Sequence, residues 1–271
     1  MKPRAAVTAF AAALLVAACG PSTPADRSLS STQSPAPSRT SSPSTRSQNP
    51  APQTASPFGP PSTAPAAAGP ASGYIPGTTV VSGTEGESKY RTTIPTLTGG
   101  SPAVVERFRA AVRAGQRAVL PGSEADGRRY TTEDGVVPAG FRTAVTSITP
   151  YLVSGLIVAE SFAYRAAHPY TSIATIVIDT ATASPIAFDD VFTDPATALA
   201  RMRSLAPGLD GSRRLQDAGY DDFRDWLPRR DGFQAFVSVP FVLGSYIPVT
   251  VPWAKLSDLM RPGMLQKLSR D

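Results

Sequence analysis

His168 is the only histidine in this 271-residue chain, so any reaction that needs an imidazole has to use it. A Ser-His-Asp hydrolase site, with Asp189 or Asp190 as the orienting carboxylate, is formally possible. However, the chain contains no Gly-x-Ser-x-Gly sequence to present a nucleophile. Pro169 favours an extended backbone at His168. We therefore interpret His168 as a structural residue whose ring bonds a neighbouring backbone group at a strand junction. Asparagine could partly replace it in that role, and we expect no enzyme.

Metal ligands are scarce in the sequence. Zinc needs three or four nitrogen, sulfur or carboxylate ligands, and a single histidine without a nearby thiol is a poor start. The remaining candidates are two runs of aspartates, Asp189, Asp190 and Asp194 in the first and Asp217, Asp221, Asp222 and Asp225 in the second. Neither run has the alternating oxygen ligands and the glycine of a calcium loop, and Asp194 is more simply a helix cap. No glycine-rich phosphate loop is present, so we expect no metal and no cofactor.

Cys19 is the only cysteine, and it follows a segment with the anatomy of a signal peptide. Lys2 and Arg4 precede an apolar run over residues 5–18 that is too short to span a bilayer stably. The junction Val16-Ala17-Ala18-Cys19 resembles the lipobox of bacterial lipoproteins. That resemblance implies cleavage after residue 18, a diacylglycerol on the Cys19 thiol and a further acyl chain such as palmitate on the new amino terminus. The alternative is an ordinary signal peptide in which the cysteine is incidental.

Two or three acyl chains on one residue hold a protein on a membrane durably. We therefore expect residues 1–18 to be a lipoprotein signal peptide and the mature chain to be anchored through Cys19. The expected location is the outer face of the cell membrane.

Residues 19–73 are predicted to form a disordered linker. The stretch consists almost entirely of Pro, Ser, Thr and Ala, and Leu29 and Phe58 are its only large apolar residues. Such a segment buries too little surface to offset the entropy of ordering it. Its 54 residues from Gly20 onward would reach roughly 40 Å as a flexible coil and roughly 170 Å as extended polyproline. An inert spacer is favoured over a binding segment, and the composition also suits O-glycosylation.

The charge of the chain is concentrated before the expected domain. The whole chain carries a net charge of +5, from 26 basic and 21 acidic side chains. Five of the basic residues and one of the acidic residues precede residue 74, which leaves 21 basic and 20 acidic side chains in residues 74–271. A nearly neutral domain lacks the basic surface that binds phosphate backbones. Charge and the expected location therefore both exclude nucleic acid as a partner.

Residues 74–271 are long enough for one domain with a substantial core, and they contain no thiol. Strands are predicted over residues 90–97, 141–151, 155–164, 172–179, 233–239 and 246–251. Helices are predicted over residues 102–120, 195–206, 213–227 and 253–260. Ser101 is expected to cap the first helix, and Pro207-Gly208 is expected to end the second. Strands mixed with helices without regular βαβ spacing indicate an α+β fold: an antiparallel sheet with packed helices, preceded by a disordered tether.

Several segments of this domain resemble the RsiV-like extracytoplasmic domain and, in the order of their elements, the secreted immunogenic antigens of mycobacteria. The similar segments are 162–169, which runs from an aromatic strand to His168-Pro169, then 178–179, 185–192 and 249–256. The resemblance covers roughly residues 87 to 262 and implies structural motif positions at Tyr164, His168, Pro169, Asp189 and Phe192. The high ratio of arginine to lysine and the abundance of alanine resemble the composition of a high-GC actinobacterial protein.

The chain departs from that family in two places. Arg165 and Ala166 stand where the family usually has glycine or other small residues, so the turn before His168 is expected to differ in backbone shape. The loop over 240–245 is also shorter than usual. One branch of the family is the outer half of an anti-sigma factor that binds lysozyme and has a transmembrane helix and a cytoplasmic segment. This chain shows neither, so we expect no signalling by that route.

Three functions remain open from the sequence. We favour a lipid-anchored binding module, monomeric and without catalysis, that recognises an extracellular protein or an envelope glycan. The alternatives are an accessory structural lipoprotein of an envelope complex and a cell-wall or ester hydrolase that uses His168. Exposed aromatic side chains at Tyr170, Phe241 or Tyr246 would indicate a recognition surface.

Overall fold

The computed structural model of the chain describes residues 64–121, 128–216 and 223–269. All of them belong to one unit, Thr54–Asp271. Cys19, the expected signal peptide and most of the expected linker lie outside the described residues.

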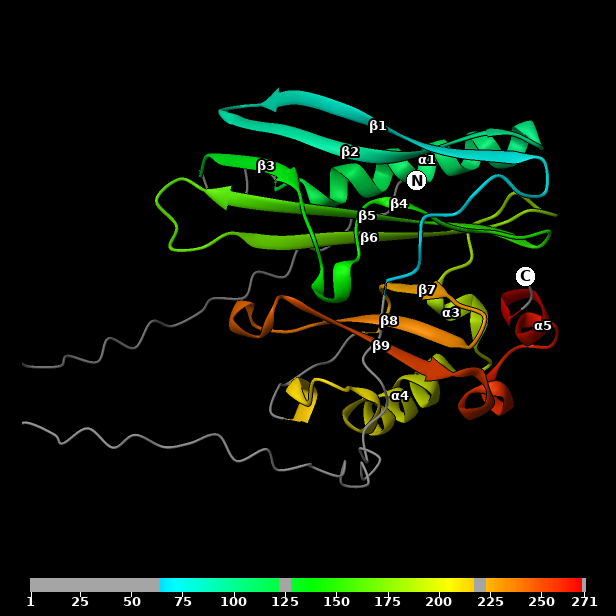
Figure 1. Cartoon of the computed structure of the whole chain (residues 1–271). Coiled ribbons are helices and arrows are strands. Elements are labelled where there is room, and N and C mark those ends of the chain that lie inside the picture. Colours follow the sequence, from blue (N-terminus) through cyan, green and yellow to red (C-terminus); the bar gives the residue numbers. More distant parts are fainter. Residues whose placement is uncertain (1–63, 122–127, 217–222, 270–271) are drawn as a thin grey trace, which may run out of the picture. The chain divides into compact units, whose positions relative to one another are not determined.

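The larger of two sheets has six strands and supplies the frame of the domain (Figure 1). Its strands are β1 (Tyr74–Glu85), β2 (Ser88–Gly99), β3 (Tyr130–Asp134), β4 (Ala144–Ile148), β5 (Leu152–Ala163) and β6 (Tyr170–Asp179). Pairing runs β1-β2-β3-β5, and β5 also pairs with β4 and β6. Every pair is antiparallel except β2 with β3, which is parallel. The predicted α+β class with antiparallel strands is confirmed.

Strand β5 sits at the centre of this sheet and is buried along most of its length. One face, which includes Val153 and Ile157, packs against helix α1 (Pro102–Val119) through Phe108 and its neighbours. The other face, which includes Leu156, packs against the second sheet. Gly155 allows α1 to approach closely, because a Cβ there would lie 3.0 Å from the ring of Phe108.

The second sheet and its helices form the other half of the core. The three antiparallel strands are β7 (Trp226–Pro228), β8 (Gly232–Ser238) and β9 (Tyr246–Pro252). The helices on this side are α3 (Phe188–Val191), α4 (Pro195–Leu209) and α5 (Met264–Ser269). Aromatic rings fill the space between them, with Phe233 packed against Phe188, Phe192, Trp226 and Trp253. The layers therefore run from α1 through the two sheets to α4 (Figure 1).

The described residues include five short 3₁₀ turns, three of which lie within two of the predicted helices. The turns are η1 (Pro138–Gly140), η2 (Arg214–Gln216), η3 (Phe241–Leu243), η4 (Trp253–Lys255) and η5 (Ser257–Leu259). The helix predicted over 213–227 is wrong at both described ends, because η2 occupies its start and strand β7 its end; residues 217–222 lie outside the described part. The helix predicted over 253–260 is likewise divided into η4 and η5. Leu215, Phe223 and Trp226, whose spacing suggested the first of these helices, are buried as predicted, so tertiary packing overrides local helical spacing there.

Two predicted helix ends also differ from the structure. Helix α4 continues to Leu209 with Pro207 inside its last turn, where a missing N–H removes only one helical bond. Ser101 stands at the N-cap of α1, but its side chain makes no capping hydrogen bond. In contrast, the Asp194 carboxylate caps α4 as predicted, accepting from the amides of Ala196 and Thr197.

Residues 64–73, the last part of the expected linker, run along the domain. The amide of Ala64 donates to the carbonyl of Ala139 at 3.3 Å, and that of Ala68 donates to the carbonyl of Val145 at 2.9 Å. Ala68 also packs at the edge of the α1 core. These contacts attach the chain to the domain upstream of Tyr74.

Candidate functional site

His168 lies in the turn that joins β5 to β6, at the end of the long hairpin (Figure 1). Its Nδ1 is 2.9 Å from the carbonyl oxygen of Pro169, which is the kind of bond to a neighbouring backbone group that the sequence predicted. The imidazole is exposed rather than buried. It stacks on the ring of Phe241 in η3, with ring centroids 4.1 Å apart and planes within 6°. The stack joins the end of the larger sheet to a loop of the smaller one.

The loops around this stack contain three non-glycine residues in the left-handed region of backbone space. The φ angles are 68° for Ala139, 64° for Arg165 and 63° for Ser245. This conformation costs a residue with a Cβ about 1–2 kcal/mol, and such strain concentrates at functional sites. Arg165, at a position where the family usually has glycine or another small residue, thus adopts a conformation that glycine would adopt without strain.

Large apolar side chains are exposed at the same end of the domain. Val242 is 88% exposed, Tyr164 58% and Phe241 43%. A shallow cavity of about 400 Å³ separates Val136 from Phe241. We call this region the hairpin-end surface, and its members are Val136, Phe162, Tyr164, His168, Phe241 and Val242.

Tyr164 gives the hairpin-end surface a cationic border. The guanidinium of Arg129 lies 4.4 Å from the centroid of the Tyr164 ring, and that of Arg165 lies 5.1 Å from it. Phe162, two residues earlier near the end of β5, is also exposed. The border therefore combines aromatic rings with two arginines.

Of the three aromatic residues that could have marked a recognition surface, Phe241 is exposed and the other two are partly covered. Tyr170 packs edge-on against Tyr130 at 6.0 Å. Burial and the nearby charge of Asp225 raise the pKa of Tyr246, against a smaller opposing effect of the Ile173 backbone. Tyr246 therefore stays neutral at physiological pH and belongs to the packing between the sheets.

The structure separates the remaining motif residues from His168. Asp189 forms an ion pair with Arg224 at 2.9 Å, and Asp190 accepts from the amide of Ala187 at 2.9 Å. Phe192 is fully buried in the core of the second sheet. Within the described part of the chain, neither aspartate is a hydrogen-bond partner of His168. The resemblance therefore picks out two separate turns, the β5–β6 turn at His168 and the turn at α3, rather than a single site.

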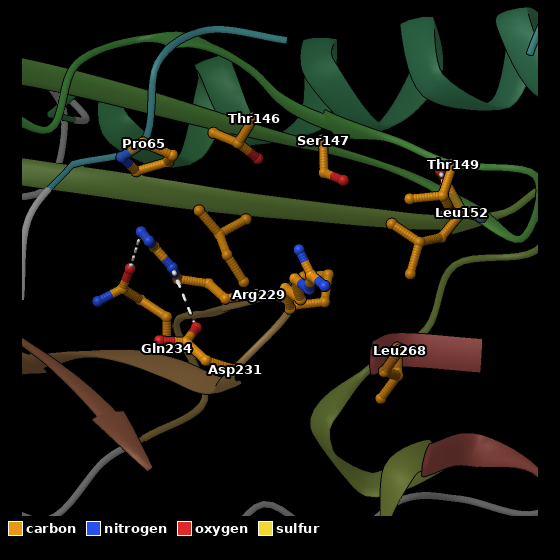
Figure 2. Close-up of a pocket in the computed structure, with 12 residues that line it drawn as sticks. Pro65, Thr146, Ser147, Thr149, Leu152, Arg229, Asp231, Gln234 and Leu268 are labelled. Carbon is orange, nitrogen blue, oxygen red and sulfur yellow. Dashed lines mark hydrogen bonds and ion pairs between the residues drawn. The ribbon is translucent and has the colours of Figure 1, made fainter. Parts of the chain in front are cut away.

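A second hollow lies between the two sheets, and no sequence motif pointed to it. This cavity, which we call the seam pocket, has a volume of about 410 Å³. Its lining includes Thr146 and Ser147 of β4, and Arg229, Arg230 and Asp231 of the β7–β8 turn. Figure 2 shows the Arg229 guanidinium between Gln234 and Asp231, below the hydroxyls of β4. These residues are far apart in the sequence, and none forms a recognisable motif.

The described ranges hold no candidate for metal binding or for a membrane-spanning helix. Residues 64–121, 128–216 and 223–269 contain no group of three histidine, cysteine, aspartate or glutamate residues that could hold a metal ion. The same ranges contain no helix that is long and apolar enough to cross a bilayer.

No family model matches this chain, and no curated protein matches it. A crystal structure from Bacteroides fragilis, described as a member of the DUF3298 family, is similar in fold, with a TM-score of 0.50 and 12% sequence identity. The match covers 73% of this chain and 98% of that one. A DUF3298 family protein from Pseudomonas aeruginosa matches with a TM-score of 0.41 and 16% identity, over 70% of this chain and 94% of the other. The likeness to the first protein identifies the fold alone.

Proposed function

We propose that this protein is a lipid-anchored binding module on the outer face of the cell membrane and that it recognises another protein through its hairpin-end surface. The observation that carries the proposal is the exposure of Val242, Phe241 and Tyr164 together at one end of the domain. The lipidated residue in this proposal is Cys19. The RsiV-like segments of the sequence, which imply an extracytoplasmic domain, support the same conclusion.

The composition of the hairpin-end surface favours a protein as the partner. Protein interfaces are enriched in tyrosine, phenylalanine and arginine, and their strongest contacts are aromatic or arginine side chains near the centre of a patch. Tyr164 with Arg129 and Arg165 matches that composition. A cluster of exposed apolar side chains around Val242 is unusual on a monomer that contacts only water. The strained turn at Arg165 then holds the aromatic residues in a fixed arrangement for the partner.

The proposal includes no catalytic step. An acid–base histidine needs a partner that orients it and a nucleophile within hydrogen-bond reach. The Nδ1 of His168 instead faces the carbonyl of Pro169, and the sequence candidates Asp189 and Asp190 are bonded to Arg224 and Ala187. A binding role for the His168 turn accounts for these contacts more simply than hydrolysis does.

Site-specific photocrosslinking in intact cells tests the proposal. A photoreactive phenylalanine analogue replaces Val242 in one strain and Ile75 in a control strain; Ile75 is also exposed but lies on β1, away from the hairpin-end surface. We expect one discrete crosslinked protein from position 242 and none from position 75. Adding Tyr164→Ala should abolish the product at position 242. Equal crosslinking at the two positions, or a product that is insensitive to Tyr164→Ala, would show that the surface has no specific partner.

A further inference from the structure

We propose that the protein forms a symmetric dimer in which residues 78–84 of β1 pair antiparallel with the same residues of a second copy. The larger sheets of the two copies then join into one continuous sheet. The contact does not depend on the hairpin-end surface, because no member of that surface belongs to β1. A dimer of this kind departs from the monomer that the sequence led us to expect.

Strand β1 lies at one edge of the larger sheet (Figure 1). Within residues 64–121, 128–216 and 223–269, β2 is the only strand that pairs with it, in a register that runs without a bulge from Tyr74 to Glu85. At twelve residues, β1 is longer than the usual strand of about 5–6 residues. A long edge strand presents a row of backbone N–H and C=O groups with which another strand can pair.

Tyr74 shows which backbone groups of β1 point away from β2. Its amide donates to the carbonyl of Ala71 at 2.8 Å, and its carbonyl accepts from the amide of Ala71 at 3.1 Å. Alternate residues of an antiparallel strand direct their backbone groups to the same side, so the outward groups of β1 belong to its even-numbered residues. Two prolines fit this assignment. Neither Pro76 nor Pro95, which is opposite Thr78, has an N–H to donate between the two strands.

The part of the edge that can pair begins after Pro76. The outward groups of Tyr74 are already bonded to Ala71, and Pro76 has no N–H. Ile75 therefore lies outside the contact. Between Pro76 and the β1–β2 turn, outward N–H and C=O groups belong to Thr78, Val80, Ser82 and Thr84, and all four residues are exposed. In the described ranges, no backbone group of another segment bonds to them.

This segment is complementary to itself. A two-fold axis through Val81 places residue 78 opposite residue 84 of the second copy, and residue 80 opposite residue 82. Each of these residues has outward backbone groups, so every outward N–H meets an outward C=O. The facing side chains also match, because Thr78 is opposite a threonine and Val81 is opposite itself. Threonine pairs and β-branched pairs of this kind stabilise neighbouring strands.

The charges near the edge permit two copies to approach. Residues 74–84 contain no charged side chain, whereas edge strands that avoid pairing usually carry lysine, a proline or a bulge. A symmetric contact brings each charge close to its own copy only near the axis. The first charge of β1, Glu85, is four residues from the axis and lies opposite Gly77 of the second copy. Like charges therefore do not face one another along the paired strands.

Disulfide trapping on the purified, detergent-solubilised full chain tests this register. Val81→Cys places two thiols at the axis, where the Cα atoms of a pair without mutual hydrogen bonds are about 4.5 Å apart, a separation that a disulfide spans. Thr79→Cys is the matched control, because its two copies would be about 13 Å apart along the strands. After mild oxidation with copper phenanthroline, we expect at least about tenfold more covalent dimer from Val81→Cys. The parent chain, whose only cysteine is Cys19, gives the background.

A second pair of variants tests the edge without a change of the axis. Val80→Lys, added to Val81→Cys, places two ammonium groups diagonally across the paired strands, where like charges disfavour pairing. It should lower the yield of dimer at least about threefold. Val80 is 51% exposed, so thermal unfolding of this variant should match that of its Val81→Cys parent. Val242→Lys in the same Val81→Cys chain is the control at an exposed valine outside β1, and it should leave the yield unchanged.

The other outcomes overturn the inference. Equal yields from Val81→Cys and Thr79→Cys would mean that the thiols meet by random collision. No dimer from either variant would mean that this edge is left to solvent or to a strand of another protein. A yield that falls with Val242→Lys but not with Val80→Lys would assign the dimer to the hairpin-end surface instead.

Discussion

The imidazole of His168 lies flat against the ring of Phe241 with 4.1 Å between the ring centroids. The sequence predicted a structural histidine whose ring bonds a neighbouring backbone group, a role that asparagine could partly take. The exposed stack changes that expectation, because asparagine has no ring to place on Phe241. A stacked aromatic pair contributes about 0.5–1.5 kcal/mol beyond the area that it buries.

We therefore expect His168→Ala and His168→Asn to destabilise the protein by similar, small amounts and His168→Tyr to be nearly neutral. A double-mutant cycle with Phe241→Ala, measured by urea denaturation, should give a coupling energy of about 0.5–1.5 kcal/mol. A coupling energy near zero would mean that the two rings are adjacent without stabilising each other.

Lys267 of α5 donates to the carboxylate of Asp179 at the end of β6. Burial alone would raise the pKa of Asp179, but the Lys267 ammonium and the amides of Thr182 and Ala181 outweigh it and lower that pKa. A carboxyl group with a lowered pKa in the folded state stabilises the protein above the pKa of the unfolded state, about 4. This stabilisation is lost as the pH falls through the pKa of the folded state.

Lys267→Met should accordingly cost about 1–3 kcal/mol of unfolding free energy at neutral pH, because a largely buried carboxylate loses its charged partner. The cost should shrink when the pH falls below about 4. Urea denaturation at a series of pH values measures this dependence, with Lys255→Met, an exposed lysine of η4, as the control. A cost that does not depend on pH would assign the effect to packing of the lysine stem.

Gly232 is the first residue of β8, directly after the β7–β8 turn, and the backbone of β9 passes close to it. A Cβ at this position would lie 2.4 Å from the carbonyl oxygen of Val251. Since backbone atoms cannot move away easily, Gly232→Ala should destabilise the domain by about 1–3 kcal/mol. Gly208→Ala in α4 is the matched control, with open space around the new methyl group, and should be neutral or stabilising by up to about 1 kcal/mol. Thermal unfolding of both variants would contradict this explanation if their melting temperatures shifted alike.

Cys19→Ala tests the anchor independently of the fold. If Cys19 is the lipidated residue, the variant should leave the membrane fraction or accumulate as the unprocessed precursor, because the acyl chains hold the chain on the membrane. Fractionation of cells followed by immunoblotting measures both outcomes. Thr23→Ala, a neighbouring change outside the expected cleavage junction, should fractionate as the parent does. Membrane association and mobility identical to the parent in Cys19→Ala would disprove the lipoprotein assignment.

Regular periodicity made parts of the fold predictable. The spacing of Val104, Phe108 and Val112 predicted α1, and these side chains are buried against the larger sheet. The β-branched runs predicted strands over residues 155–164 and 172–179, where β5 and β6 lie. Strand β1, in contrast, was missed because most of its side chains are exposed on both faces. Its structure comes from continuous pairing with β2, which leaves no alternation of apolar residues in the sequence.

The candidate sites were less predictable than the fold. The sequence marked His168, but its partner Phe241 lies more than 70 residues away, and only the packing of the two sheets brings them together. The sequence gives even less indication of the seam pocket. A bulge at Thr146 and a turn at Arg229 leave no pattern in the sequence, since both are defined by pairing with other strands.

Strand β5 contains a segment that is prone to aggregate when it is exposed, and the folded domain buries that segment. Residues 152–159, Leu-Val-Ser-Gly-Leu-Ile-Val-Ala, contain no charge and no proline, and such segments form intermolecular β-structure when they are exposed. In the native state β3, β4 and β6 cover both edges of this strand. If the chain is exported as proposed, it crosses the membrane before it folds, and this segment then needs rapid folding or a chaperone. Aggregation from partly unfolded molecules, rather than proteolysis of a surface loop, should therefore set the yield of destabilised variants.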